Sequence, residues 1–263
     1  MSAPSSPLVS LLAGSLVAAL AWWTGALSRG GALAAAGIGT AILSGTGWGG
    51  GAVLLAFFIP STLVSRLLPD PTKALLDPRD HGRDHWQVLA NGGIAGLGGL
   101  LGLQFPGPAI WIVTASLAAA AADTWATSWG ARSSRHPYSI ISGHPVPAGT
   151  SGGVTTIGTL GGALGGALVA ACAAVLTHDA RLLAAGGVGF LGMAADSVIG
   201  ALWQGKFRCS TCDCATERRV HRCGTRSTSV SGLGWLTNDG VNALATTLAG
   251  LGGAALWLWF SSH

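Results

Sequence analysis

The amino-acid sequence predicts an all-α fold, a polytopic integral membrane bundle of about eight transmembrane helices. Only 9 % of the 263 residues are charged, whereas 49 % are hydrophobic. A soluble domain usually carries about 25 % charged residues, so a compact globule of this composition would lack the charged surface that keeps it in water. The 42 glycines follow no three-residue period and glutamate occurs once, which excludes collagen and coiled coils.

Eight apolar stretches are long enough to cross a bilayer, whose hydrocarbon core needs about 17 to 25 helical residues. They cover residues 8–27, 31–47, 49–66, 87–104, 108–130, 153–177, 182–203 and 240–260. The division at Trp48 separates two spans that would otherwise form one long tilted helix. We treat residues 1–263 as a single transmembrane domain.

The basic residues support the division at Trp48. Eight spans place Arg29 and the loops 66–86, 131–152 and 204–239 on one side of the membrane. These segments hold 13 of the 14 lysines and arginines, and only Arg181 lies opposite. By the positive-inside rule the three loops are cytoplasmic and both termini are non-cytoplasmic. The loops account for the formal net charge of +4, so no nucleic-acid partner is expected.

Glycine and alanine fill the predicted spans, which indicates close helix packing. Gly161 and Gly165, like Gly162 and Gly166, are four residues apart, and such small residues let helices approach closely in lipid. No internal repeat is strong enough to suggest inverted halves, which weighs mildly against a transporter.

Three acidic residues lie near the predicted cytoplasmic ends of three spans: Asp123, Asp196 and Asp239. A carboxylate inside the bilayer costs about 2.5 to 3.5 kcal/mol on insertion scales and usually pairs or faces a polar cavity. Oxygen ligands without His or Cys suit Mg²⁺, so we expect one shared catalytic site in which Asp123 and Asp196 hold the metal. The alternative is that each acid bonds or caps a neighbouring helix. The polar residues beside the acids are candidate substrate-binding residues: Thr127, Ser197, Asn238 and Asn242.

A glycine-rich segment precedes the sixth span. Glycines interleaved with hydroxyls before a helix can turn backbone N–H groups toward an anion, although an ordinary turn and helix cap would look similar. It is not a Walker loop. The candidate phosphate-binding residues are Gly149, Thr150, Ser151, Gly152, Gly153 and Thr155.

The loop before the fourth span carries a second set of candidates. Arg79 and Arg83 can make bidentate phosphate contacts, and Asp80 and Asp84 can hold those arginines or a metal. Asn91 follows in the span. A solvated loop whose charges pair with one another is the alternative.

Four of the five cysteines cluster between the last two spans. Cys209, Cys212, His221 and Cys223 form a candidate structural Zn²⁺ site, and a reduced thiol cluster is the alternative on a cytoplasmic loop. The positive excess of this loop also suits contact with anionic lipid.

Five of these motifs together resemble a known integral membrane family. They begin at Arg83 (Arg-Asp-x-x-Gln-Val-Leu-Ala-Asn-Gly-Gly), Ala122 (Ala-Asp-Thr-Trp-Ala-Thr), Gly149 (Gly-Thr-Ser-Gly-Gly-Val-Thr), Asp196 (Asp-Ser-Val-Ile-Gly) and Asn238 (Asn-Asp-x-Val-Asn). In this order they resemble the family named domain of unknown function 92, also called the transmembrane protein 19 family, which includes phytyl-phosphate kinase. This chain has Ser128 where that family commonly has Glu.

The resemblance implies a kinase that converts an isoprenoid monophosphate to its diphosphate, with CTP as the expected phosphoryl donor, at the cytoplasmic membrane face. Together with the acids it suggests Mg²⁺ as the cofactor, and a nucleotide, an isoprenoid phosphate lipid and membrane lipid as partners. The alternatives are a cytidylyltransferase that forms a CDP-lipid, a lipid or ion transporter, and a non-catalytic scaffold. Asp123 and Asp196 at opposite depths of the membrane would favour the transporter.

Overall fold

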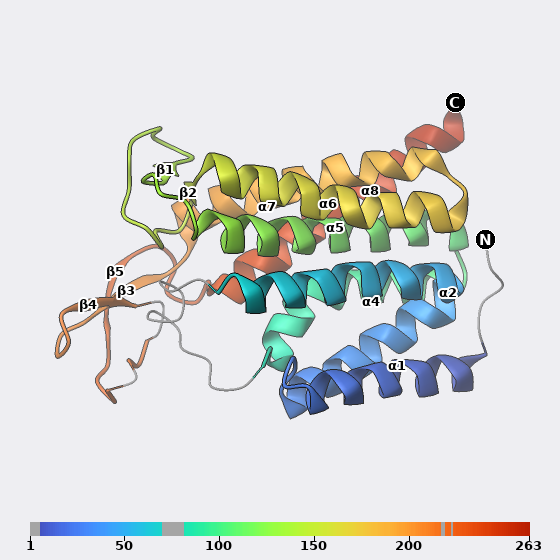
Figure 1. Ribbon diagram of the computed structural model, residues 1–263, viewed down its shortest axis with the longest axis horizontal. Coiled ribbons are helices and arrows are strands. Elements are labelled where there is room, and N and C mark those ends of the chain that lie inside the picture. Colours follow the sequence, from blue (N-terminus) through green and yellow to red (C-terminus); the bar gives the residue numbers. More distant parts are fainter. Residues whose placement is uncertain (1–5, 70–81, 217–218, 222) are drawn as a thin grey trace.

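The computed structural model describes residues 6–69, 82–216, 219–221 and 223–263. Within these residues seven α-helices lie side by side as a bundle (Figure 1). They are α1 (Pro7–Trp23), α2 (Arg29–Leu67), α4 (His85–Gly102), α5 (Pro106–Gly130), α6 (Thr156–Thr177), α7 (Ala184–Trp203) and α8 (Asn238–Ser262). By length and composition, five helices of the described part of the chain can cross a membrane; α2, α5, α6 and α8 are four of them, and the fifth is α7 with the 3₁₀ turn η1 (Ala180–Leu183) before it.

Helix α2 is a hairpin of two helical stretches that meet at Gly47. The backbone of Gly47 has φ 68° and ψ −163°, a conformation that residues with a side chain rarely adopt. Both ends of α2 lie beside the C-terminal end of α1, because α2 begins six residues after Trp23 and Arg66 Nη2, near its end, donates to Thr24 O at 2.7 Å. The division predicted at Trp48 is therefore present, one residue earlier, and the described residues form eight helical segments.

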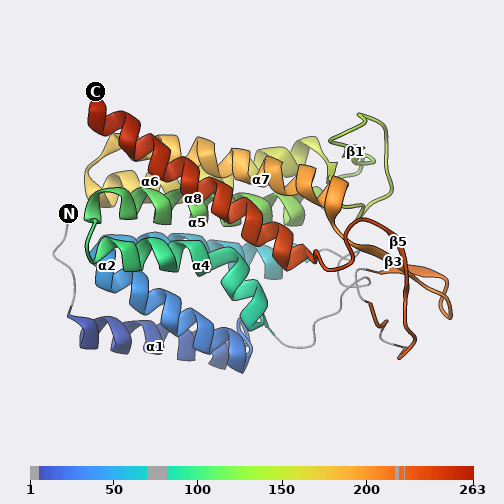
Figure 2. The same ribbon diagram turned by 180° about the vertical axis from the view of Figure 1, so that it is seen from behind.

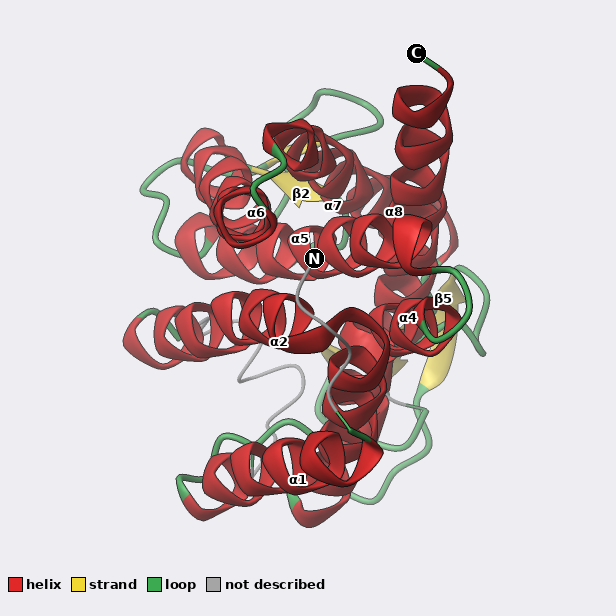
Figure 3. Cartoon of the chain, turned by 90° about the vertical axis from the view of Figure 1, so that its right-hand side faces the viewer, coloured by secondary structure: helices red, strands yellow, loops and turns green. Residues whose placement is uncertain are grey.

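Helix α5 forms the centre of the bundle. It contacts α2, α4, α6, α7 and α8, and it carries an almost continuous buried stretch from Ala109 to Ala122. Seen along the helices, it lies between α2 and α4 on one side and α6 and α7 on the other (Figure 3). Residues near the C-terminal end of α5 can therefore face several helices at once.

The predicted close packing through small residues is present between α5 and α6. Gly161 lies against the Trp129 ring and Gly165 against the Trp125 ring, so close that an added Cβ would stand 2.8 Å and 2.9 Å from ring carbons. The two indoles stack with ring centroids 6.2 Å apart. This contact fixes the rotation of α5 about its axis.

Two small antiparallel sheets lie in the connections at one end of the bundle (Figures 1 and 2). One pairs β1 (Tyr138–Ser139) with β2 (Gly153–Val154). The other has the order β4-β3-β5, from β3 (Lys206–Cys209), β4 (Cys214–Thr216) and β5 (Thr228–Ser231). The sixth span was predicted to begin at residue 153, but Thr155 caps α6 by accepting a hydrogen bond from Gly158 N, and the two preceding residues form a strand instead.

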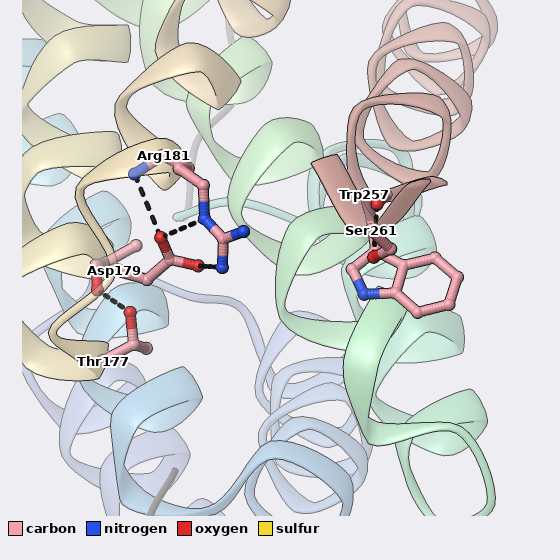
Figure 4. Close-up of polar contacts among 6 residues, drawn as sticks. Thr177, Asp179, Arg181, Trp257 and Ser261 are labelled. Atoms are coloured by element: carbon pink, nitrogen blue, oxygen red, sulfur yellow. Dashed lines mark hydrogen bonds and ion pairs between the residues drawn. The ribbon is translucent and has the colours of Figure 1, made fainter. Parts of the chain in front are cut away.

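At the opposite end of the bundle α1 begins and α8 ends (Figure 2). The connection between α6 and α7 lies there too and carries Arg181, the basic residue predicted on this side. Its Nε and Nη2 donate to the two carboxylate oxygens of Asp179 at 2.9 Å and 3.1 Å (Figure 4). Arg181 lowers the pKa of Asp179 through these bonds. The pair leaves no net charge on this connection.

Candidate functional site

A cavity of about 240 Å³, hereafter the polar cavity, opens at the end of the bundle that carries the two sheets. Its lining comes from α5, the segment 131–155, the first turn of α6, α7, Gln204 and the first residue of α8. Asp123 and Asp196 both line it, from α5 and α7. The described structure therefore brings two of the three predicted acids to one cavity, at the same end of the bundle.

One face of the last turns of α5 forms a wall of the polar cavity. Asp123, Thr127 and Gly130 are spaced by four and three residues, which places them on one side of a helix. The tryptophan face of α5 packs against α6 and so turns this polar face inward. Ser128 is 6 % exposed and is not among the lining residues, so it lies on another side of α5.

The glycine-rich segment forms a second wall. Gly149 and Gly152 have φ angles of +82° and +81°. Gly152 lies against α7, where an added Cβ would clash with the Ala201 side chain and stand 2.8 Å from Ser197 O. Gly152 O accepts a hydrogen bond from Ile140 N and Gly153 N donates to Thr150 O, each at 2.9 Å. All six residues predicted for this segment line the cavity: Gly149, Thr150, Ser151, Gly152, Gly153 and Thr155.

Three polar residues of α7 and the α7–α8 connection complete the lining. Ser197 follows Asp196 on α7, and Asn238 is the first residue of α8. Gln204, directly after α7, is 3 % exposed, and its Nε2 has no hydrogen-bond partner within the described residues. A buried donor without a partner costs about 1 to 3 kcal/mol, so the cavity offers Gln204 Nε2 to an acceptor on a ligand.

Among the lining residues that were not predicted from the sequence, Arg135 and Gln204 add hydrogen-bond donors to the cavity. Arg135 is exposed and supplies a cation to the cavity that the two carboxylates also line. The sequence signals were weak, because Arg135 is one of several basic residues in a polar loop and Gln204 stands where a span gives way to a loop.

Asp239 and Asn242 are not among the residues that line the polar cavity. They lie in the first turns of α8, between Asn238 at the cavity and Thr246, whose Oγ1 donates to Ala90 O of α4 at 2.9 Å. Asn242 is 8 % exposed. Their predicted roles stay predictions.

The loop before α4 leads to a different cavity. Arg83 and Asn91 line an apolar cavity of about 210 Å³ between α1, α2 and α4, which shares no lining residue with the polar cavity. Burial lowers the pKa of Arg83 to about 10, with a further contribution from Arg66, so Arg83 is a cation at neutral pH. Asp84 caps α4 by accepting from Gln87 N at 3.0 Å. Arg79 and Asp80 lie outside the described residues.

The apolar cavity follows the length of the helices. Its lining on α1 runs from Ala13 to Ala21, a rise of about 12 Å. Trp48, beside the turn at Gly47, lines the opposite end from Arg83. The lining of this cavity is thus mostly apolar, and Arg83 is the one cation among its described lining residues.

The four candidate zinc ligands also come together. The ligand atoms of Cys209, Cys212, His221 and Cys223 all lie within 4.8 Å of one another. In the described part of the chain this is the one group of three or more His, Cys, Asp or Glu side chains with such convergence.

Comparisons with known proteins agree with a membrane bundle. The sequence model of a family described as "Integral membrane protein DUF92" matches residues 12–250. An uncharacterized membrane protein of Methanocaldococcus jannaschii is 30 % identical over 207 residues, covering 78 % of this chain and 75 % of the relative. Protein PGR of Arabidopsis thaliana is 28 % identical over 231 residues, covering 75 % and 78 %. An uncharacterized membrane protein of Synechocystis is 29 % identical over 223 residues, covering 80 % and 75 %. No solved structure matches the chain.

Proposed function

Because the chain belongs to the integral membrane family DUF92, we propose that it is a Mg²⁺-dependent kinase that phosphorylates an isoprenoid monophosphate to the diphosphate. CTP or another nucleoside triphosphate is the donor. The observation that carries the proposal is the meeting of Asp123 and Asp196 with the glycine-rich segment 149–153 in one cavity. The substrate class comes from the resemblance. The five motifs resemble a family that includes the phytyl-phosphate kinase of plants and cyanobacteria.

The donor atoms of the polar cavity fit Mg²⁺. The lining has carboxylate, hydroxyl and amide groups but, within the described residues, no His or Cys side chain. Mg²⁺ prefers oxygen ligands and usually uses one or two carboxylates together with substrate phosphates. Asp123 and Asp196 would hold it, and the bound ion would neutralise charge on the transferred phosphoryl group.

The other lining residues are suited to bind the nucleotide. The segment 149–153 borders the N-terminus of α6, where backbone N–H groups and the helix dipole favour an anion. Arg135 adds a full positive charge, and Gln204 Nε2 offers a buried donor to an acceptor atom. These groups orient the triphosphate chain along the cavity.

The reaction needs alignment more than proton transfer. An oxygen of the lipid monophosphate attacks the γ-phosphorus of CTP, and the bond from that phosphorus to the oxygen bridging it to the β-phosphate breaks. The products are CDP and the lipid diphosphate. The attacking phosphate oxygen is already ionised, so the site needs no general base.

The apolar cavity is the site proposed for the isoprenoid chain. It runs along α1, α2 and α4, and Arg83 at its end can bind the phosphate of the lipid. Asn91 lines the same cavity, and Asn242 lies on α8, the helix whose Thr246 Oγ1 donates to Ala90 O of α4. We propose that both cavities face the cytoplasm, where nucleotides are available.

A cytidylyltransferase would use the same nucleotide and lipid phosphate but would release pyrophosphate. A transporter needs acids at different depths, whereas Asp123 and Asp196 share one cavity at one end of the bundle. The geometry therefore favours an enzyme over a transporter.

The test is to incubate the full chain, purified in detergent, with labelled CTP, Mg²⁺ and a set of prenyl monophosphates. We expect CDP and lipid diphosphate, no pyrophosphate, and loss of turnover when EDTA removes Mg²⁺. Pyrophosphate with a CDP-lipid product would assign the cytidylyltransferase reaction instead. No turnover with any prenyl monophosphate, in protein whose helical circular dichroism is intact, would refute the kinase.

A further inference from the structure

In the connection between α7 and α8, the described residues 204–216, 219–221 and 223–237 form a small module around the sheet β4-β3-β5. Its apolar core is minimal: Phe207 and Leu236 are buried, but Val230 and Trp235 are 65 % and 67 % exposed. Below about 40 residues a folded unit usually needs disulfides, a metal or a partner. The described cysteines of the module form no disulfide, which leaves a metal and the contacts with α7 and α8 to stabilise it.

Three thiols and an imidazole converge beside the sheet, with Cys209 and His221 buried and Cys212 and Cys223 exposed. Cys209 is fully buried and His221 is 9 % exposed. The Cys209 and Cys223 sulfurs are 3.5 Å apart, and His221 Nδ1 is 3.2 Å from the Cys223 sulfur. A tetrahedral Zn²⁺ with Zn–S bonds of about 2.3 Å requires S···S separations of about 3.8 Å and S···N separations of about 3.5 Å. Small side-chain shifts would bring these atoms to that geometry.

Two tight turns present the ligands to one another. The turn after Cys209 uses Asp213 at φ +49°, and the turn after His221 uses Gly224 at φ +83°. His221 N donates to Thr225 O at 2.9 Å, which fixes the second turn. The Thr225 hydroxyl lies 2.9 Å from that of Thr211 in the first turn, so the two turns are joined beside the cluster.

We propose that Cys209, Cys212, His221 and Cys223 form a structural Zn²⁺ site. Three thiolates and an imidazole are the ligands that Zn²⁺ selects, and four protein ligands leave no open position for a reacting group. Nδ1 is the ligand atom of His221, because it faces the Cys223 sulfur, whereas Nε2 lies 3.6 Å from the sulfur of Cys214. Cys214 is thus a neighbour of the site and not a ligand.

Backbone bonds and apolar packing attach the module to the helices that line the polar cavity. Leu233 N donates to Trp203 O at the end of α7, and Gly205 N donates to Leu236 O just before α8. Leu236 packs on Ile199 of α7 and Val241 of α8. An ion that orders the module would thus support the connection that carries Gln204 and leads into Asn238. This inference does not depend on the kinase reaction.

The experiment measures the metal content of the full chain, purified in detergent under reducing conditions with no metal added. Inductively coupled plasma mass spectrometry is expected to find about one zinc ion per chain for the wild type. Cys209→Ser and Cys223→Ser should each lower the zinc content at least tenfold. Cys214→Ser, in the same module, and Cys172→Ser, in α6, should keep it.

A second measurement uses the wild type alone, so its result does not depend on whether a variant folds. A strong zinc chelator should make the thiols of Cys209, Cys212 and Cys223 reactive toward a thiol reagent, and added Zn²⁺ should protect them again, while helical circular dichroism stays constant. Iron in place of zinc, no metal with all thiols reactive, a Cys209–Cys223 disulfide, or equal zinc loss in Cys214→Ser and Cys209→Ser would each overturn the proposed site.

Discussion

At the scale of single residues, one position along a helix decides which side chain reaches the polar cavity. Asn238 and Asp239 are neighbours in the first turn of α8, yet only Asn238 is among the lining residues. Successive residues of a helix point about 100° apart, so a motif that contains both residues does not reveal which of them faces a site. Only the rotation of α8 in the bundle, fixed in part by the bond from Thr246 to Ala90, decides this.

Asp123 and Asp196 are the residues on which the proposed reaction depends most directly. Asp123→Asn and Asp196→Asn should each lower kcat/KM for CTP at least about 100-fold, because loss of metal-bound charge removes several kcal/mol of transition-state stabilisation. Steady-state kinetics of the purified variants, beside the melting temperature of each, provides the measurement.

Asp179→Asn is the matched control, since it makes the same chemical change at the other end of the bundle, where Asp179 pairs with Arg181. Its kcat/KM should stay within about twofold of the wild type, because Asp179 lies away from the polar cavity. Loss of the ion pair should also leave the protein folded, since such pairs contribute about 0 to 1 kcal/mol to stability. Equal losses in all three variants would mean that the first two act through folding alone.

The site residues that could be predicted from the sequence are those whose chemistry conflicts with their surroundings. A carboxylate within an apolar span is costly and therefore conspicuous, which is why Asp123 and Asp196 could be placed together. Arg135 and Gln204 could not be predicted as site residues, because a polar residue in or beside a polar loop is not unusual. The route of the segment 131–155 back over α5 and α7 brings Arg135 to the cavity, and no local pattern encodes that route.

At the scale of elements, the helices were predicted within a few residues because bilayer thickness sets their length. The largest difference is at the end of α1, predicted at residue 27 and found at Trp23, where residues 24–28 turn instead and bond to Arg83. The strands were not predicted. Each has two to four residues, too few for the alternating pattern that identifies a strand.

The glycine-rich segment offers a test of an element's position. Gly152→Ala adds a Cβ that clashes with Ala201 and Ser197 O, so the segment must move away from α7. We expect the KM for CTP to rise at least about tenfold, since misplaced phosphate-binding groups lose their alignment. Kinetics with CTP varied at saturating lipid provides the measurement.

Gly143→Ala separates this displacement from backbone strain. Gly143 also has a positive φ, +69°, but a Cβ added there meets nothing within 4 Å. Both variants should lose about 1 to 2 kcal/mol of stability from the left-handed backbone conformation. Only Gly152→Ala should change KM. An equal rise of KM in both variants would show that strain, and not contact with α7, is responsible.

At the scale of the whole molecule, the two ends of the bundle differ in charge. Within the described residues the end with the polar cavity carries nine basic side chains: Arg29, Arg66, Arg83, Arg132, Arg135, Lys206, Arg208, Arg219 and Arg226. The opposite end carries Arg181, which Asp179 neutralises in a bidentate pair. This asymmetry exists only because α2 reverses at Gly47; a straight α2 would invert every later helix.

The charge asymmetry predicts the orientation of the protein in the membrane, because loops rich in Lys and Arg stay in the cytoplasm. A short fragment of a split fluorescent protein, inserted after Ser142 in the exposed turn before Gly143, should be complemented by the larger fragment expressed in the cytoplasm. The same fragment placed after His263 should give no signal, since α8 ends at the opposite end of the bundle (Figure 2). The reverse pattern would put the polar cavity outside the cell, away from nucleotides, and would remove the physical basis for a CTP-dependent reaction. Signal from both positions would instead mean that α2 crosses the membrane once, against the reversal at Gly47.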